Sequence, residues 1–292
     1  MLRSLIRKSL FLRKLVGYNI ASSGLFDNYF KNYPLSKGLQ QRLNDILSSE
    51  DNIFIPRVAN AGELIKGKQI MHNGLKIYVG SYYGPEYTVV LSKNKGVHEP
   101  QEERVFNEVL NSMPIGATML EMGAFWSFYS MWFNSKVEGA KNYMVEPDEF
   151  NLGQGKRNFR LNKMKGEFIK AFIDKESSID NGIVTLSVDE IIEKNNIPFL
   201  DMLHSDIQGF EYNMLQGAIK SIADNRIGYV FISTHSNEVH YQCEDFLKQH
   251  NFLILSSADL SQSYSEDGLI VAVAKTYKNI IQPISISRKN NV

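Results

Sequence analysis

The 292-residue chain contains little cysteine: its single cysteine is Cys243. One cysteine cannot form an internal disulfide, and no CxxC or cysteine–histidine cluster suggests zinc, so we expect a reducing, cytoplasmic compartment. Cys243 itself is expected in the core. No charge of one sign dominates, since Lys and Arg together number 32, as do Asp and Glu. Nucleic-acid-binding chains usually carry a basic excess, so we expect no nucleic-acid partner.

Long apolar runs are also missing. No stretch reaches the roughly 18 apolar residues of a membrane-spanning helix, and we expect none. Residues 1–16 (MLRSLIRKSLFLRKLV) hold five basic residues and no acid, and their apolar runs are too short for a signal peptide. As a helix this segment is amphipathic. Three interpretations stay open, namely contact with an anionic membrane surface, packing on the rest of the protein and a frayed terminus.

Three zones follow one another along the chain. Residues 1–97 read as a small mixed α+β region, with a helical pattern at 39–47 and a hairpin turn at Asn73-Gly74. The run EYTVVLS (86–92) reads as a further strand. Residues 98–276 form the main domain, and 277–292 form a C-terminal tail.

The main domain alternates short apolar runs with helical patterns. This alternation predicts an α/β fold: a doubly wound, mainly parallel seven-stranded sheet with helices on both faces. The last two strands are joined by DLSQSYSEDG, which contains no helix, so we expect a terminal antiparallel hairpin at the sheet edge. The expected strands are 117–122, 142–146, 167–173, 199–205, 229–234, 252–257 and 269–274.

The turn after the first of these strands carries the main functional signal. The segment MLEMGAFWSFYS (119–130) lacks the G-x-G-x-x-G that holds a pyrophosphate, which argues against NAD or FAD. Gly123 would let the backbone approach a ligand. Glu146, 25 residues after Glu121, ends the second strand, where an acid can accept hydrogen bonds from both ribose hydroxyls. The pattern suits a nucleoside cofactor without phosphate.

The segments MLEMGAFWSFYS, YMVEPDEFNLGQGKRNFRLN, TLSVDEII, DMLHSDIQGFEYNMLQGA and VFISTHS, taken in this order, resemble the FkbM-type S-adenosylmethionine (SAM)-dependent methyltransferases. The resemblance implies a class I fold, SAM as cofactor and a hydroxyl acceptor on a sugar, glycoconjugate or related small molecule. Two positions depart from the family pattern. Ser127 stands at the second glycine of the turn, and HSDIQG (204–209) replaces lysine-x-aspartate-x-glutamate-glycine.

Candidate site residues follow from these positions. His235 ends the fifth strand and is the natural base at neutral pH. Asp206 ends the fourth strand, and His204, two residues earlier, is expected on the same side. The predicted catalytic residues are Asp206, His235 and His204. The predicted cofactor-binding residues are Glu121, Gly123, Ala124, Phe125, Trp126, Ser127, Glu146, Pro147, Phe172 and Asp206. The predicted acceptor-binding residues are Gln208, Glu211 and Tyr129.

Some alternatives stay open. Glu211 could cap the following helix instead of binding the acceptor. We expect no metal, although His204, Asp206 and His235 could together bind a divalent ion. Tyr82, Tyr83 and Tyr87 could cover the acceptor. The main functional alternative is a non-catalytic SAM-fold protein associated with glycan biosynthesis, and the oligomeric state is open.

Overall fold

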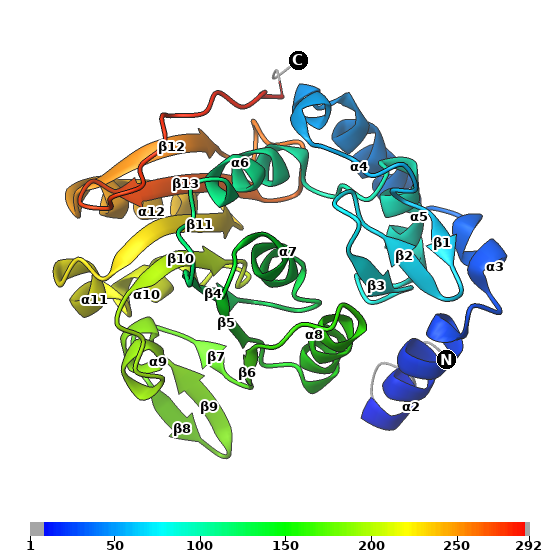
Figure 1. Cartoon of the computed structure of the whole chain (residues 1–292), viewed down its shortest axis with the longest axis horizontal. Coiled ribbons are helices and arrows are strands. Elements are labelled where there is room, and N and C mark those ends of the chain that lie inside the picture. Colours follow the sequence, from blue (N-terminus) through cyan, green and yellow to red (C-terminus); the bar gives the residue numbers. More distant parts are fainter. Residues whose placement is uncertain (1–8, 290–292) are drawn as a thin grey trace.

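The computed structural model describes residues 9–289, and its centre is a seven-stranded sheet (Figure 1). The strand order is β12-β13-β11-β10-β4-β5-β6. The strands are β4 (Thr118–Met122), β5 (Lys141–Val145), β6 (Glu167–Ile169), β10 (Leu200–Ser205), β11 (Ile227–Thr234), β12 (Phe252–Ala258) and β13 (Gly268–Ala274). The paired strands β6, β5, β4, β10 and β11 run parallel to one another. The predicted α/β class and mainly parallel sheet are confirmed.

The terminal antiparallel hairpin is present at the edge of the sheet, as predicted. β13 pairs antiparallel with β12 and also with β11, so it lies between them and β12 forms the edge. The N-terminal end of β13 therefore reaches the same sheet edge as the C-terminal end of β11, with Gly268 opposite Thr234. This placement brings the loop before β13 next to the tips of the parallel strands.

Helices cover both faces of the sheet (Figure 1). One face packs against α6 (Pro100–Leu110), α7 (Phe128–Lys136) and α8 (Glu149–Leu161). The other packs against α9 (Val188–Lys194), α10 (Glu211–Gln216), α11 (Ile219–Ala223) and α12 (Asn237–Gln249). Alternate residues of a strand face opposite sides: Met119 packs with the first group and Leu120 with the second. Cys243 is fully buried in the second group, as predicted.

The expected strand 167–173 is divided between two sheets. Its first half is β6, whereas its second half is β7 (Phe172–Ile173), which pairs with β9 (Ile183–Leu186). β9 also pairs with β8 (Ser178–Asp180) through a turn at Asn181-Gly182, where both residues have positive φ. These three strands form a separate small sheet in the order β7-β9-β8, and residues of β7 and β9 form one wall of a cavity.

The N-terminal region is mixed α+β, as predicted. Its helical segments are α2 (Leu10–Lys14), η1 (Leu15–Ile20), η2 (Ala21–Ser23), α3 (Asp27–Lys31), α4 (Lys37–Ser48), η3 (Glu50–Phe54) and α5 (Pro85–Lys93), and its strands are β1 (Leu64–Ile65), β2 (Lys68–Ile70) and β3 (Lys76–Tyr78). The Asn73-Gly74 turn joins β2 to β3. The strand expected at 86–92 is wrong, since these residues lie in α5. Pro85 starts this helix at its first position, and one run, Thr88–Leu91, is buried.

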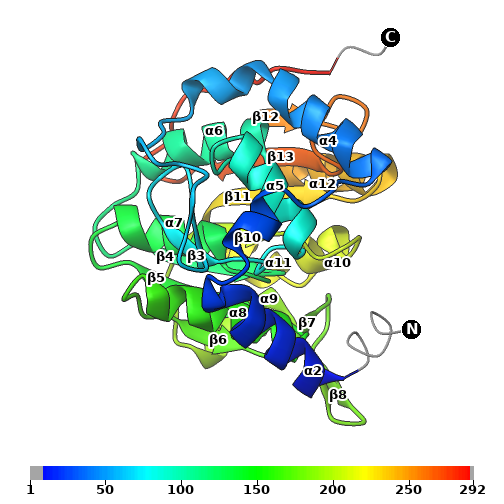
Figure 2. The ribbon, with the colours of Figure 1, turned by 90° about the vertical axis from the view of Figure 1, so that its right-hand side faces the viewer.

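The N-terminal segment packs on α8, and Figure 2 shows α2 lying across that helix. Arg13 makes two hydrogen bonds with Asp148, of 2.7 and 2.9 Å, and Lys14 pairs with Glu149. For residues 9–16 this agrees with packing on the rest of the protein, whereas residues 1–8 of the expected amphipathic helix lie outside the described part. Within residues 9–289, no helix is long and apolar enough to cross a membrane.

Candidate active site

A cavity of about 570 Å³ opens at the C-terminal ends of β4, β5 and β10. In an open α/β sheet this edge, at the point where the strand order reverses, is where ligands bind. The size is that of a small-molecule site, and most of the wall is apolar. Of the predicted cofactor-binding residues, Gly123, Phe125, Glu146, Pro147, Phe172 and Asp206 line the cavity.

The turn after β4 is shaped by close contact with β10. Gly123 has φ +70°, and a Cβ placed on it would lie 1.7 Å from the backbone oxygen of Asp206. The backbone N–H of Asp206 donates to the oxygen of Met122 at 3.0 Å, so the two strand ends are tied together here. Glycine is required at position 123 both by its positive φ and by this contact.

Glu146 holds the same turn from the second strand. Its carboxylate accepts hydrogen bonds from the backbone N–H of Phe125 at 3.1 Å and of Asp148 at 2.9 Å. Burial raises the pKa of Glu146. Each carboxylate oxygen still has acceptor capacity toward the cavity that Glu146 lines. An acid in this place can receive the two hydroxyls of a ribose.

Replacing Glu146 with Gln should weaken binding of S-adenosylhomocysteine (SAH) about 5- to 30-fold. The amide keeps the shape of the side chain, but it loses the charge that strengthens hydrogen bonds to hydroxyls by roughly 1–2 kcal/mol. Isothermal titration calorimetry at neutral pH measures the effect. Glu149→Gln is the control, because Glu149 is exposed and pairs with Lys14. Equal SAH affinity in Glu146→Gln and the wild type would contradict a ribose role.

Glu121 lies behind the turn and does not line the cavity. Its carboxylate accepts a hydrogen bond from the backbone N–H of Ser130, at 3.2 Å, in the first turn of α7. Burial raises the pKa of Glu121 to about 7. Glu121 and Glu146 thus support the two ends of the turn between β4 and α7. The sequence predicted that Glu121 contacts the cofactor, whereas in the structure its carboxylate bonds the first turn of α7.

Because Glu121 is buried with a raised pKa, we expect the free energy of unfolding to depend on pH. Because its pKa is raised in the folded chain, Glu121 favours the folded state when neutral, and it removes stability as the pH rises from about 4.5 to about 7. We expect Glu121→Gln to gain about 2 kcal/mol relative to the wild type between pH 5 and pH 8. Urea denaturation at the two pH values measures this gain. Glu176→Gln, on the surface, should show the same difference at both.

The other predicted residues of the turn are buried away from the cavity. Trp126 stacks on Phe128 and on Tyr82 of the N-terminal region, with ring centroids 5.1 and 4.5 Å apart. Ala124 donates its N–H to the oxygen of Val145. Ser127 has φ +61°, a left-handed conformation that a second glycine would adopt more easily. These residues shape the turn from behind.

Asp206, which also lines the cavity, lies beside His235. The imidazole Nε2 is 3.3 Å from Oδ1 of Asp206 and 3.3 Å from Oδ1 of Asp267, and Nδ1 is 2.8 Å from Oε1 of Glu211. Burial alone would lower the pKa of His235, but its hydrogen bonds with Asp206 and Glu211 and the charge of Asp267 outweigh burial and raise the pKa to about 10. The ring therefore carries a proton at neutral pH.

His204 does not join this group. Its Nε2 is 2.7 Å from Glu102 of α6, whose other oxygen accepts from Ser233 at 3.1 Å. His204 and Tyr129 are both buried, with ring centroids 4.4 Å apart, and neither lines the cavity. The expectation that His204 and Asp206 share a side is wrong because β10 ends at Ser205, so Asp206 no longer follows the strand's alternation.

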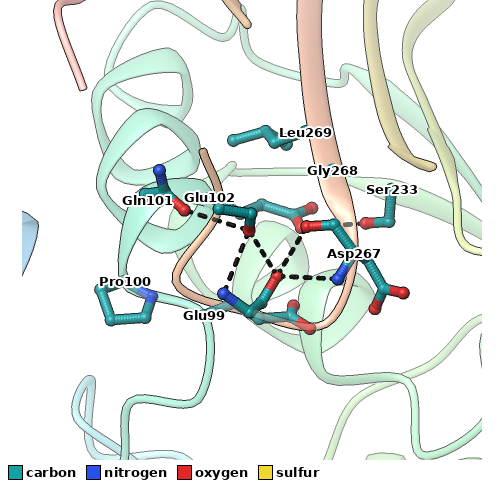
Figure 3. A pocket seen from close by; sticks show the side chains of 10 residues that line it. Glu99, Pro100, Gln101, Glu102, Ser233, Asp267, Gly268 and Leu269 are labelled. Atoms are coloured by element: carbon teal, nitrogen blue, oxygen red, sulfur yellow. Dashed lines mark hydrogen bonds between the residues drawn. The ribbon is translucent and has the colours of Figure 1, made fainter. Parts of the chain in front are cut away.

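Figure 3 shows the acidic surroundings on the α6 side, where Glu99, Glu102 and Asp267 meet Ser233 around a pocket of about 10 Å³. That volume is about the space of one water molecule. Burial raises the pKa of Glu99 to about 7, and burial together with the charge of Asp206 raises that of Asp267 to about 6. Among residues 9–289 no group of three or more His, Cys, Asp or Glu is arranged to hold a metal ion.

The predicted acceptor-binding residues divide in the same way. Gln208 lines the cavity, and its amide lies 2.8 Å from Nε2 of His235. Glu211 is fully buried and accepts from the backbone N–H groups of Ile207 and Gly209, so it holds the loop that precedes α10 and does not line the cavity. It does not cap the helix either, because the start of α10 has no side-chain cap.

Sequence reasoning missed several residues of the site. Asp267 precedes β13, and it reaches the site because β13 rather than β12 pairs with β11, an order of the two hairpin strands that the sequence does not specify. Ile183 and Thr185 reach the cavity from β9, which was not predicted. His98, which is not among the predicted site residues, is buried, and its ring nitrogens lie 3.4 Å from Glu99 and 2.6 Å from Glu103.

Residues 165–254 match the family model described as the methyltransferase FkbM domain. The chain is similar to this family over that segment. The matched segment contains Asp206, Gln208 and His235, whereas Gly123 and Glu146 precede it. The match confirms the resemblance, the enzyme class of SAM-dependent methyltransferase and SAM as its cofactor.

The solved structures that are similar to this chain share little of its sequence. One is a precorrin-6y C5,15-methyltransferase from Geobacter metallireducens GS-15, at 13% identity over 60% of this chain and 89% of that one, with a TM-score of 0.42. The TrmK of M. capricolum with SAH has 12% identity over 59% and 68%, with a TM-score of 0.38. The Pyrococcus abyssi tRNA (uracil-54, C5)-methyltransferase with SAH has 14% identity over 70% and 43%, with a TM-score of 0.43. No curated protein matches the chain.

Proposed function

We propose that the chain transfers a methyl group from SAM to a hydroxyl of a sugar, glycoconjugate or related small molecule. One observation carries this proposal: the Gly123 turn, Glu146 and Asp206 line a single cavity, and Asp206 lies beside the charged His235. Glu146 suits the ribose of a nucleoside, and Asp206 suits the acceptor and its proton.

The residues present fit SAM. Glu146 would hold the ribose hydroxyls, and the apolar side chains of Phe172 and Ile207 would flank the adenine. The Gly123 turn lets the backbone approach the methionine part, since a Cβ there has no room. When bound, SAM supplies a methyl group on a sulfonium, which is a good leaving group. The protein's part is to align the acceptor and to take up a proton.

The part of the cavity wall at Asp206 suits an acceptor rich in hydroxyls. The Asp206 carboxylate, with Asp267 nearby, offers hydrogen-bond acceptors, and the Tyr83 ring lies beside them. Carboxylates accept from hydroxyl groups, and an aromatic ring packs on the apolar face of a sugar. The same negative charge repels phosphates. The surroundings of Asp206 therefore favour a neutral polyol over a nucleic acid, in line with a net charge of zero.

Asp206 is the better candidate for the base. His235, predicted as the base, is protonated at neutral pH because three carboxylates surround it. As the acceptor oxygen bonds to the methyl carbon, its hydroxyl proton becomes strongly acidic, so a carboxylate suffices to accept it. In this mechanism His235 fixes the position of Asp206.

The experiment that tests the proposal is methyl transfer to a panel of acceptors. The purified chain is incubated with SAM labelled in its methyl group and with methyl glycosides of several hexoses, an aliphatic amine and a short RNA. Formation of SAH together with a sugar methyl ether, identified by mass spectrometry, is expected. Transfer to the amine or the RNA alone would overturn the hydroxyl assignment. SAH binding without turnover of any acceptor would favour the non-catalytic alternative.

A further inference from the structure

A second cavity, of about 500 Å³, lies between the N-terminal segment and the catalytic domain. Its walls include Val16, Ala21 and Phe30 of the N-terminal segment and Phe150 of α8. These residues come from separate parts of the chain, and they meet because α2 lies across α8 (Figure 2).

The two cavities share part of their walls. Tyr83, Phe125 and Asn151 line both. Phe125 belongs to the turn after β4, and Tyr83 is close enough to Asp206 for that charge to help raise its pKa. A ligand that extends from the second cavity past these residues would therefore enter the first cavity, which Asp206 also lines.

The lining of the second cavity is mostly aliphatic and aromatic. Two of its polar side chains are already engaged, Arg13 with Asp148 and Ser81 with Asn158. Glu86, also at the wall, adds a negative charge. The cavity therefore suits neither a phosphate nor another anion, and burial of apolar surface is what it can offer a ligand.

We propose that this second cavity is a binding site for an aliphatic chain carried by the methyl acceptor, with Tyr83 and Phe125 at the junction between the chain and the reacting hydroxyl. The inference rests on the proposed function, because it takes the first cavity as the site of methyl transfer. It assigns the N-terminal segment a part in acceptor selection, through Val16, Ala21 and Phe30.

The test is the chain-length dependence of binding. Methyl, butyl and hexyl glucoside are titrated below their micellar concentrations into the full chain with SAH present. Affinity is expected to rise about fourfold with each added CH₂, which corresponds to about 0.8 kcal/mol. In Val16→Trp, which fills the cavity, hexyl glucoside should bind no better than methyl glucoside. Leu25→Trp, at a side chain 84% exposed in the same region, should behave as the wild type.

The possible results distinguish failure of the second site from failure of the proposed function. A flat series in the wild type, with SAH bound normally, overturns the second site and leaves the proposed function standing. Failure to bind SAH overturns the proposed function itself. If Val16→Trp does not fold, Phe30→Ala replaces it: a wall that loses this ring should flatten the dependence on chain length, whereas an unchanged dependence contradicts the proposal.

Discussion

Asp206→Asn is expected to lower kcat for methyl transfer by about 10²- to 10³-fold, while the dissociation constant of SAH changes by less than threefold. The substitution keeps the size of the side chain and its backbone contact with Gly123. It removes the carboxylate that would accept the acceptor's proton, and general-base catalysis contributes a factor of this order. Single-turnover methyl transfer and SAH calorimetry on the same preparations measure the two quantities.

The matched control is Asp180→Asn, which removes an exposed carboxylate of β8 outside the cavity. It should leave both quantities at wild-type values. A kcat within threefold of the wild type in Asp206→Asn would show that another group takes up the proton. A large loss of SAH affinity would instead place Asp206 on the cofactor.

Gly123→Ala is expected to have the largest effect on stability, a loss of about 4 kcal/mol or more. The positive φ alone costs an L residue about 1–2 kcal/mol. The added methyl group would also lie 1.7 Å from the Asp206 backbone oxygen, so the ends of β4 and β10 must separate. SAH binding should be lost as well, because both walls of the cavity move. Thermal and urea denaturation, with SAH calorimetry, check these outcomes.

A second glycine isolates the two causes. Gly116 has φ +78°, and a Cβ on it would meet nothing within 4 Å. Gly116→Ala should therefore lose only the 1–2 kcal/mol that belongs to the backbone conformation. Comparable losses in the two variants would mean that the loop after β4 relaxes away from Asp206 at little cost.

The fold was largely predictable from its pattern. The strands of the main sheet are nearly continuous apolar runs separated by helical patterns, a combination that specifies a parallel sheet. α5 was misread because Thr88, Val89 and Val90 favour strands, whereas tertiary packing decides the structure. The β8–β9 hairpin had a local signal, Asn181-Gly182, but the surrounding residues are mostly exposed and carry no clear alternation.

The site was predictable in part. Strand tips placed Gly123, Glu146 and Asp206 in one cavity, since the carboxyl ends of parallel strands meet at one edge. The sequence does not show that the side chains of His204 and Glu121 are buried. His204 bonds Glu102 of α6 and Glu121 bonds Ser130 of α7, and these contacts depend on how the two helices pack on the sheet. The protonation of His235 was also hidden, because it depends on charges that reach the ring from three different loops and helices.

Because β13 is the last strand of the chain, the two parts of the site are synthesised at different times. The described walls of the cofactor cavity come from residues 83–210, all of which precede α12. Asp267 arrives only with β13, near the end of the chain. During synthesis, the residues of the nucleoside-binding cavity are therefore complete before Asp267, which pairs with His235, has been added. We expect the chain to become competent for methyl transfer only after β13 has paired with β11 and β12.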